Sequence, residues 1–130
     1  MKYIRTKDGI YSRSKIICCA FAREYQSEDW NKDIESYLQT PILKQADTIE
    51  ELCDSFEVVR WDGYTFKYKS YKEAYDRWFG DGYQNVSSEM YGLINGKRVA
   101  IMTGYTEGKN PDKLELELLK ETLWKDIRFK

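Results

Sequence analysis

The chain has 130 residues, of which 42% are hydrophobic and 15% aromatic, and its 21 basic and 22 acidic side chains leave a net charge of −1. This size and apolar content fit one packed domain and argue against a disordered chain, while the near-neutral charge excludes a generally basic nucleic-acid binder. The sequence has no histidine and only three cysteines, so it lacks the commonest general base and metal ligand and does not suggest a disulfide scaffold. We therefore expect a protein that is not an enzyme and binds no cofactor and no metal.

Membrane and secretion signals are absent from the sequence. No apolar run approaches the roughly 18 residues that a membrane helix needs, and the first residues lack the apolar stretch of a secretion signal. We expect a cytoplasmic protein with reduced cysteines and no membrane partner.

The first predicted elements are two strands and a helix. Residues 2–5 alternate as a strand does, residues 7–9 form a turn, and residues 10–22 indicate a longer strand rich in isoleucine, tyrosine and cysteine. Ser27 is the expected N-cap of a helix over residues 28–38.

The clearest predicted helix covers residues 48–56. Thr48 and Glu51 have the spacing of a capping box, in which each side chain bonds the backbone near the other. The apolar residues of this segment recur every three or four positions, as on one helical face: Ile49, Leu52, Cys53 and Phe56.

Two further hairpins and one helix complete the main pattern. Strands over residues 57–61 and 64–68 flank a two-residue turn at Asp62-Gly63, and a capping box opens a helix over residues 70–79. Strands over residues 88–94 and 97–105 are joined by Asn95-Gly96, the strongest short hairpin signal. The end of the chain fits a strand at 113–118 followed by a helix to 127, or a single helix.

This order of elements predicts an α+β fold. Hairpins outnumber crossovers, so we expect one antiparallel sheet, built from the hairpins at 7–9, 62–63 and 95–96, with two or three helices packed on it. We expect residues 1–130 to form a single domain. The predicted core comprises Ile4, Ile17, Ile49, Leu52, Cys53, Phe56, Val58, Phe66, Ala74, Trp78, Leu93, Val99 and Ile101.

Two stretches of the sequence stand out as motifs: KYIRTKDGIY at residues 2–11 and ILKQADTIEELCDSF at residues 42–56. Both resemble a group of small uncharacterised proteins carried by phages and prophages of low-GC Gram-positive bacteria. The resemblance implies an accessory gene of a phage or mobile element that acts inside a bacterial host cell. Such genes often encode inhibitors of host defence, including anti-CRISPR proteins. The chain departs from the group at residues 12–41 and 64–85, where a function of its own would lie.

Acidic residues are concentrated in the second quarter of the chain. Residues 26–57 contain two basic and nine acidic side chains, a net charge of −7. Seven of these acidic side chains and two aromatic residues form the predicted partner-binding surface, called the acidic surface below: Glu28, Asp29, Trp30, Asp33, Glu35, Tyr37, Glu50, Glu51 and Asp54. Carboxylates on two helices could mimic a nucleic-acid backbone and occlude the basic groove of a host protein, such as a nucleic-acid-binding defence effector. The plainer interpretation is a solvated face, because negative charge is favourable in a first helical turn.

A second candidate is the aromatic stretch over residues 61–83. It contains Trp61, Tyr64, Phe66, Tyr68, Tyr71, Tyr75, Trp78, Phe79 and Tyr83, interleaved with Lys67, Lys69, Lys72 and Arg77. Because Tyr64, Phe66 and Tyr68 alternate onto one face that the following helix would cover, core packing is the favoured interpretation, and direct nucleic-acid binding is not expected. The alternative function is a phage regulatory or assembly module, with a homodimer as one form, that uses a tyrosine-rich surface.

Overall fold

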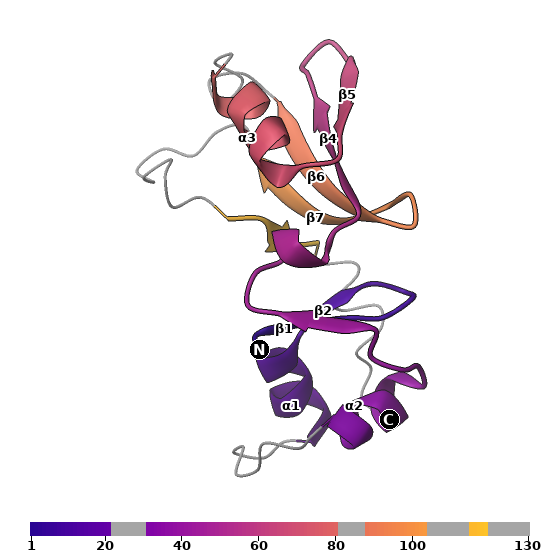
Figure 1. The fold of residues 1–130 in the computed structure, drawn as a ribbon. Helices are drawn as coiled ribbons and strands as arrows, with labels where there is room; N and C mark the ends of the chain where they lie inside the picture. Colours follow the sequence, from indigo (N-terminus) through magenta and orange to yellow (C-terminus); the bar gives the residue numbers. More distant parts are fainter. Residues whose placement is uncertain (22–30, 81–87, 104–114, 120–130) are drawn as a thin grey trace. The chain divides into compact units, whose positions relative to one another are not determined.

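The computed structural model describes residues 1–21, 31–80, 88–103 and 115–119 (Figure 1). Within them it is α+β, with antiparallel sheets of three and five strands and three α-helices, so the predicted fold class is confirmed. The contacts divide the chain into two compact units. Unit 1 comprises Met1–Leu52 with Leu118–Lys130, and unit 2 comprises Cys53–Glu117. Two compact units can still unfold together, so the expectation of a single domain stays a prediction.

Unit 1 contains the three-stranded sheet, in the order β2-β1-β3. Its strands are β1 (Tyr3–Arg5), β2 (Ile10–Ser12) and β3 (Lys44–Ala46). The hairpin predicted at residues 7–9 is confirmed, and the backbone N–H of Thr6 donates to the Gly9 carbonyl at 2.9 Å. The prediction of one sheet is wrong, because this hairpin pairs with β3 and forms a separate sheet. Strand β3 was not predicted because it is short and polar and lacks apolar alternation.

The predicted strand over residues 10–22 is wrong after its third residue. The chain turns into helix α1 (Arg13–Phe21), and the hydroxyl of Ser12 lies 3.5 Å from the Lys15 backbone nitrogen, where an N-cap side chain lies. The helix buries Ile16 and Ile17, whose β-branched side chains had suggested a strand. Burial of these two isoleucines outweighs their weak preference for extended backbone.

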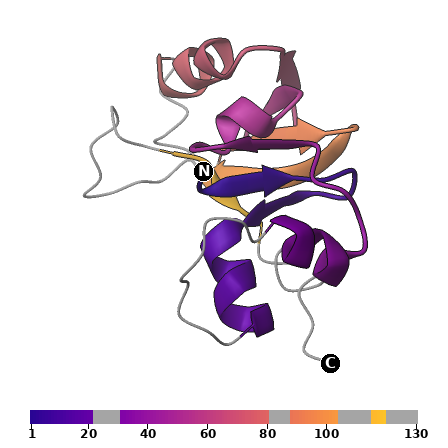
Figure 2. The same ribbon diagram turned by 60° about the horizontal axis from the view of Figure 1, so that its bottom comes forward.

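Helix α2 (Asn31–Leu38) confirms the described part of the helix predicted over residues 28–38, whereas Ser27 lies outside the described residues. Helices α1 and α2 lie on the same side of the three-stranded sheet (Figures 1 and 2). The core of unit 1 is formed by Ile4, Tyr11, Ile16, Ile17 and Ile34, with Tyr37, Leu38, Ile42 and Leu118 packed against it.

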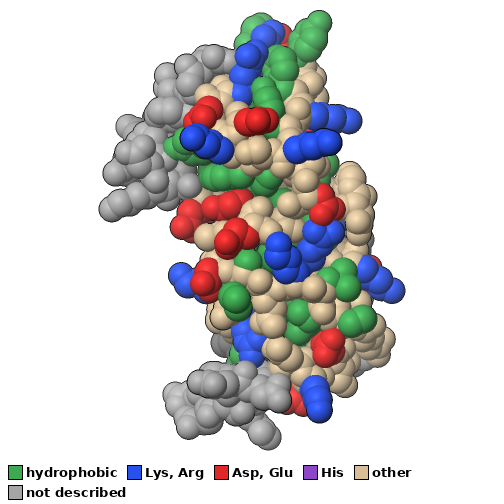
Figure 3. Space-filling model, viewed as in Figure 1, with side chains coloured by type: hydrophobic (Ala, Val, Ile, Leu, Met, Phe, Trp, Pro, Cys, Tyr) green, Lys and Arg blue, Asp and Glu red, His purple; other side chains and the backbone are tan. Residues whose placement is uncertain are grey.

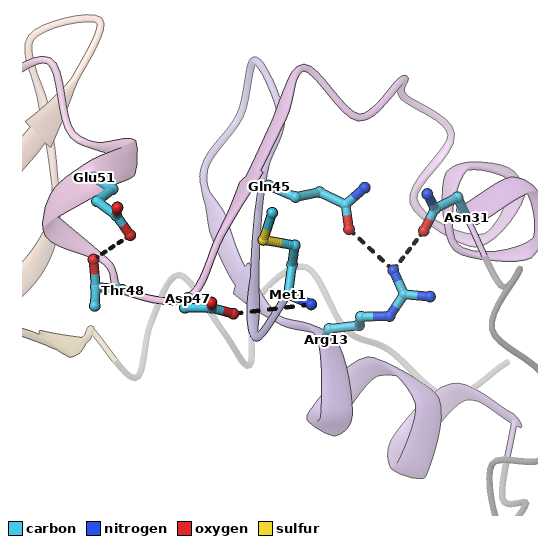
Figure 4. A network of polar contacts seen from close by, with 7 residues as sticks. All are labelled: Met1, Arg13, Asn31, Gln45, Asp47, Thr48 and Glu51. Carbon is cyan, nitrogen blue, oxygen red and sulfur yellow. Dashed lines mark hydrogen bonds and ion pairs between the residues drawn. The ribbon is translucent and has the colours of Figure 1, made fainter.

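One arginine joins three elements of unit 1 (Figure 4). The guanidinium of Arg13, at the start of α1, donates to the side-chain oxygen of Asn31 in α2 and, at 3.1 Å, to that of Gln45 in β3. Because the two acceptors lie on different elements, this one side chain links helices α1 and α2 to strand β3.

The predicted helix over residues 48–56 is wrong. A single 3-10 turn, η1 (Glu50–Leu52), is followed two residues later by strand β4 (Ser55–Val59). The Thr48 hydroxyl donates to the Glu51 carboxylate at 2.7 Å, a contact between side chains (Figure 4). The apolar spacing did identify buried residues, since Ile49, Leu52 and Phe56 are buried. Phe56 is nevertheless extended, because β4 lies between β5 and β6 and gains ladder hydrogen bonds on both of its edges.

The five-stranded sheet, in the order β5-β4-β6-β7-β8, belongs to unit 2 except for Leu118, the last residue of β8. The other four strands are β5 (Thr65–Tyr68), β6 (Glu89–Ile94), β7 (Lys97–Thr103) and β8 (Glu117–Leu118). The hairpin at Asn95-Gly96 is confirmed, with φ angles of 50° and 76° that match a type I′ turn. Strand β8 falls within the strand predicted at 113–118, and the helix predicted beyond it lies outside the described residues.

Helix α3 (Tyr71–Gly80) confirms the helix predicted over residues 70–79 and packs on β4, β5 and β6 (Figure 1). Ala74 and Trp78 are fully buried, and the ring of Tyr71 meets that of Phe56 edge to face, with centroids 5.5 Å apart. Most of the predicted core is buried, and the exceptions are half-buried: Cys53, Phe66 and Ile101.

Candidate protein-binding surface

The acidic surface is only partly present as one surface. Glu28, Asp29 and Trp30 lie outside the described residues, and Tyr37 packs against the core of unit 1. Asp33 on α2 and Glu51 in η1 are exposed, as the prediction requires.

Two of the predicted carboxylates accept hydrogen bonds from backbone N–H groups, and of these Glu35 is half-buried whereas Asp54 is exposed. The Glu35 Oε2 atom accepts a hydrogen bond of 2.8 Å from the Ile42 N–H, and the Asp54 Oδ2 atom accepts one of 3.0 Å from the Asn95 N–H. The helix that would have aligned Glu50, Glu51 and Asp54 does not form, and Asp54 belongs to unit 2 whereas the other two belong to unit 1.

The aromatic stretch divides into a buried part and an exposed part. Phe66 and Tyr68 are half-buried on the face of β5 that α3 covers, as the alternation predicted. Tyr64 was expected on the same face, but its exposed fraction is 66%, and that of Trp61 is 67%. Trp61 and Tyr64 are both at the turn of the β4–β5 hairpin, and we call these two residues with Arg60 and Asp62 the hairpin tip.

The loop of this hairpin is one residue longer than predicted. The Arg60 N–H donates to the Tyr64 carbonyl at 2.8 Å, and the Gly63 N–H donates to the Arg60 carbonyl at 3.0 Å, so residues 61–63 form a three-residue loop. Gly63 has a φ of 87°, the left-handed conformation that such loops require at their last position. The extra residue places Trp61 in the loop and carries its ring away from the sheet.

Polar contacts fix the shape of the hairpin tip. The Arg60 guanidinium forms an ion pair with Asp62 and lies 5.4 Å from the centre of the Tyr64 ring. Asp62 Oδ1 also accepts a hydrogen bond of 3.2 Å from the Tyr64 N–H. The hydrogen bond from Arg60 holds the pKa of Asp62 below its ordinary value of 3.8. The two aromatic side chains are therefore presented by a loop with its own internal support.

The sequence contained one signal for this exposure. Trp61 stands next to Asp62-Gly63, and residues in tight turns are solvent-exposed because the chain reverses there at the surface. Counting Trp61 as part of an aromatic run hid that signal. In Figure 3, hydrophobic and basic side chains gather together over the end of unit 2 where the β4–β5 hairpin lies.

The described residues contain no cluster of three or more His, Cys, Asp or Glu side chains that could hold a metal ion. None of the helices in this part of the chain is both long and apolar enough to cross a membrane.

Comparison with known proteins gives no further guide to the site. The chain matches no protein-family model, no curated protein and no solved structure.

Proposed function

We propose that this chain is a non-enzymatic protein-binding module, and that the hairpin tip is the centre of its contact surface. The observation that carries the proposal is the exposure of Trp61 and Tyr64, at 67% and 66%, on a loop held by its own polar contacts. Tryptophan, tyrosine and arginine are the residues that most often dominate binding energy at protein interfaces. An ordered loop also loses less conformational entropy on binding than a flexible one.

A protein partner suits the hairpin tip better than a nucleic acid. The Arg60 charge within the hairpin tip is compensated by Asp62 in an ion pair, and the chain carries a net charge of −1, so it lacks the overall positive charge that attracts a nucleic-acid backbone. The resemblance to phage and prophage proteins makes a bacterial host protein the proposed partner, and occlusion of that protein the proposed mode of action. The lack of histidine in the sequence favours binding over catalysis.

The hairpin tip is better supported than the acidic surface as the contact site. Glu35 is half-buried and Asp54 is exposed, and both already accept hydrogen bonds from backbone N–H groups within the chain. Glu51 is exposed and accepts a hydrogen bond from the Thr48 hydroxyl, whereas Asp33 is exposed on α2.

Affinity capture with matched variants tests the proposal. Wild-type protein and the variants Trp61→Ala/Tyr64→Ala, Asp33→Asn/Glu51→Gln and Leu43→Ala would be used as bait in lysates of low-GC Gram-positive bacteria, with bound proteins quantified by mass spectrometry. Leu43 is a suitable control because it is an exposed apolar side chain in unit 1, at 59%. We expect a partner that wild type and the control retain and the hairpin variant loses, and purified partner should reproduce that order. A partner retained by the hairpin variant and lost by the acidic variant would overturn the proposal in favour of the acidic surface.

A further inference from the structure

Strand β5 is the edge strand on its side of the five-stranded sheet. Its only partner strand among the described residues is β4, which pairs with it in antiparallel register from Phe56↔Tyr68 to Val59↔Thr65. An edge strand offers a row of backbone N–H and C=O groups to an added strand.

The hairpin loop shows which backbone groups point outward. Arg60 and Tyr64 are a hydrogen-bonded pair, since the Arg60 N–H donates to the Tyr64 carbonyl. In an antiparallel ladder such pairs alternate with pairs that make no bond to each other. Phe66, two residues on, therefore bonds β4, whereas the backbone groups of Thr65 and Lys67 point to the free edge.

The edge of β5 carries positive charge that forms no ion pair with the residues that the structure describes. Glu57 lies opposite Lys67 in the ladder, but its carboxylate is already engaged by Arg98, with Oε2 3.1 Å from Nη2. Lys67 and Lys69 are exposed, and within the described part of the chain neither makes an ion pair. Lys67 lies in β5 and Lys69 lies in the bend just after Tyr68, so the two cations are two residues apart along the chain, at the end of the edge strand away from the hairpin tip.

Protection against aggregation explains only part of this arrangement. A lysine on an edge strand commonly keeps a second copy of the chain from pairing there. Two exposed aromatic side chains at the start of the same strand have the opposite effect, because they offer apolar area to a partner. Lysines and aromatics together favour an occupant that is extended, acidic and apolar at one end.

We propose that the edge of β5 receives an extended acidic segment of the partner protein as an added antiparallel strand, with the hairpin tip holding its apolar end. An antiparallel segment runs toward the tip, so its acidic residues come first and its apolar residues follow at its C-terminal end. Acidic side chains at every second position would face Lys67 and Lys69, and main-chain hydrogen bonds to Thr65 and Lys67 would supply affinity. This inference rests on the proposed function and names the chemistry of its partner.

The test uses a designed peptide and the full chain, observed by amide NMR titration. The peptide is Thr-Glu-Val-Glu-Val-Asp-Leu-Phe, and a control peptide has Lys at each acidic position. We expect the acidic peptide to shift the amide signals of residues 64–69 and to slow hydrogen exchange of the Thr65 and Lys67 N–H groups. The control peptide should do neither.

Variants separate strand addition from simple charge attraction. Lys67→Glu/Lys69→Glu should weaken the acidic peptide about tenfold, since two exposed ion pairs become repulsions, whereas Lys97→Glu, an exposed lysine at the start of β7, should have little effect. Lys67→Pro removes an outward N–H without removing a ladder bond to β4, so it should abolish the slowed exchange at Thr65 while the fold is retained. Retained binding in Lys67→Glu/Lys69→Glu, or binding without slowed exchange, would overturn the inference.

Two other occupants have their own outcomes. Concentration-dependent dimers in sedimentation that Lys67→Pro abolishes would show that the edge receives a second copy, and stronger shifts of residues 64–69 with a ten-nucleotide oligothymidine would show a nucleic-acid site. Either result overturns the acidic segment. If the Trp61→Ala/Tyr64→Ala variant still loses its captured partner while the acidic peptide fails to bind, this inference fails and the proposed function stands.

Discussion

The carboxylate of Asp54 accepts a hydrogen bond of 3.0 Å from the backbone N–H of Asn95, at the far end of the neighbouring strand pair. Asn95 begins the type I′ turn between β6 and β7, and its left-handed conformation leaves its N–H outside the ladder. The Asp54 N–H in turn donates to the Leu93 carbonyl at 2.8 Å. Asp54, which immediately precedes β4, therefore connects the start of that strand to the β6–β7 turn.

We expect Asp54→Ala to lower the free energy of unfolding by about 1 kcal/mol, the usual net worth of one partly exposed hydrogen bond. Asp54→Asn keeps an oxygen acceptor at the same place and should lose less than half of that. Urea denaturation of the two variants and wild type measures the difference. Equal stability of Asp54→Ala and wild type would show that the contact contributes nothing in solution.

Gly92 in β6 has no room for a side chain. A Cβ atom there would lie 2.6 Å from Cys53 Sγ and 3.3 Å from Leu116 Cδ1. We expect Gly92→Ala to destabilise the protein by about 1–3 kcal/mol, the cost of overpacking a filled interior. Thermal or urea unfolding measures this cost.

The clash at Gly92 can be traced to one atom with a double variant. Cys53→Ala removes the sulfur and leaves the Cys53 Cβ at 3.6 Å, an ordinary contact distance. The Gly92→Ala/Cys53→Ala pair should therefore recover most of the lost stability, giving a coupling free energy of about 1 kcal/mol or more. Additive losses would place the strain elsewhere.

Local sequence signals predicted the turns and the later helix well. Asn95-Gly96 supplies two residues that adopt positive φ, Gly63 marks the position of the β4–β5 loop although not its length, and the segment from Tyr71 combines a cap with a helical apolar face. The information for these elements lies within a few residues. The segment at 48–56 failed because its outcome depends on partners far along the chain. The backbone around Phe56 gains ladder hydrogen bonds as a strand because β6 pairs with it, and β6 lies far along the chain from the local helix signal.

The candidate site was harder to predict for a related reason. Charge density located the acidic residues, but a formal charge does not tell which carboxylates bind backbone, as Glu35 and Asp54 do. Trp61 is exposed because the loop has three residues instead of two. The loop length follows from the pairing of Arg60 with Tyr64 in the ladder, which the Asp62-Gly63 turn signal does not specify.

Glu35 and Asp33 offer a matched pair of carboxylates on helix α2. Glu35 is half-buried and accepts the Ile42 N–H, which helps to direct the chain from α2 toward β3, whereas Asp33 is exposed. We expect Glu35→Ala to cost about 1–2 kcal/mol of stability, and Asp33→Ala to remain within about 0.5 kcal/mol of wild type. Chemical denaturation distinguishes the two, and Glu35→Gln should fall between them because its amide oxygen can still accept the bond. A larger loss from Asp33→Ala than from Glu35→Ala would contradict this assignment.

The ion pair in the hairpin tip predicts a specific response to acid. The Arg60 hydrogen bond lowers the pKa of Asp62 below 3.8 in the folded protein, so the folded state favours the carboxylate form. The contribution of the Asp62 carboxylate to the stability of the loop is therefore complete above pH 3.8 and is lost as the pH falls through the lower folded pKa.

A titration followed by the carboxyl carbon signal of Asp62 should show a midpoint below 3.8, and the Tyr64 amide signal should move with it because Asp62 accepts that N–H. Arg60→Met should raise the midpoint toward the ordinary value, whereas Arg98→Met, which removes a cation that pairs with Glu57, should leave it unchanged. An Asp62 midpoint that is the same in wild type and Arg60→Met would mean that the ion pair does not hold the loop in solution, and the preorganised presentation of Trp61 and Tyr64 would lose its support.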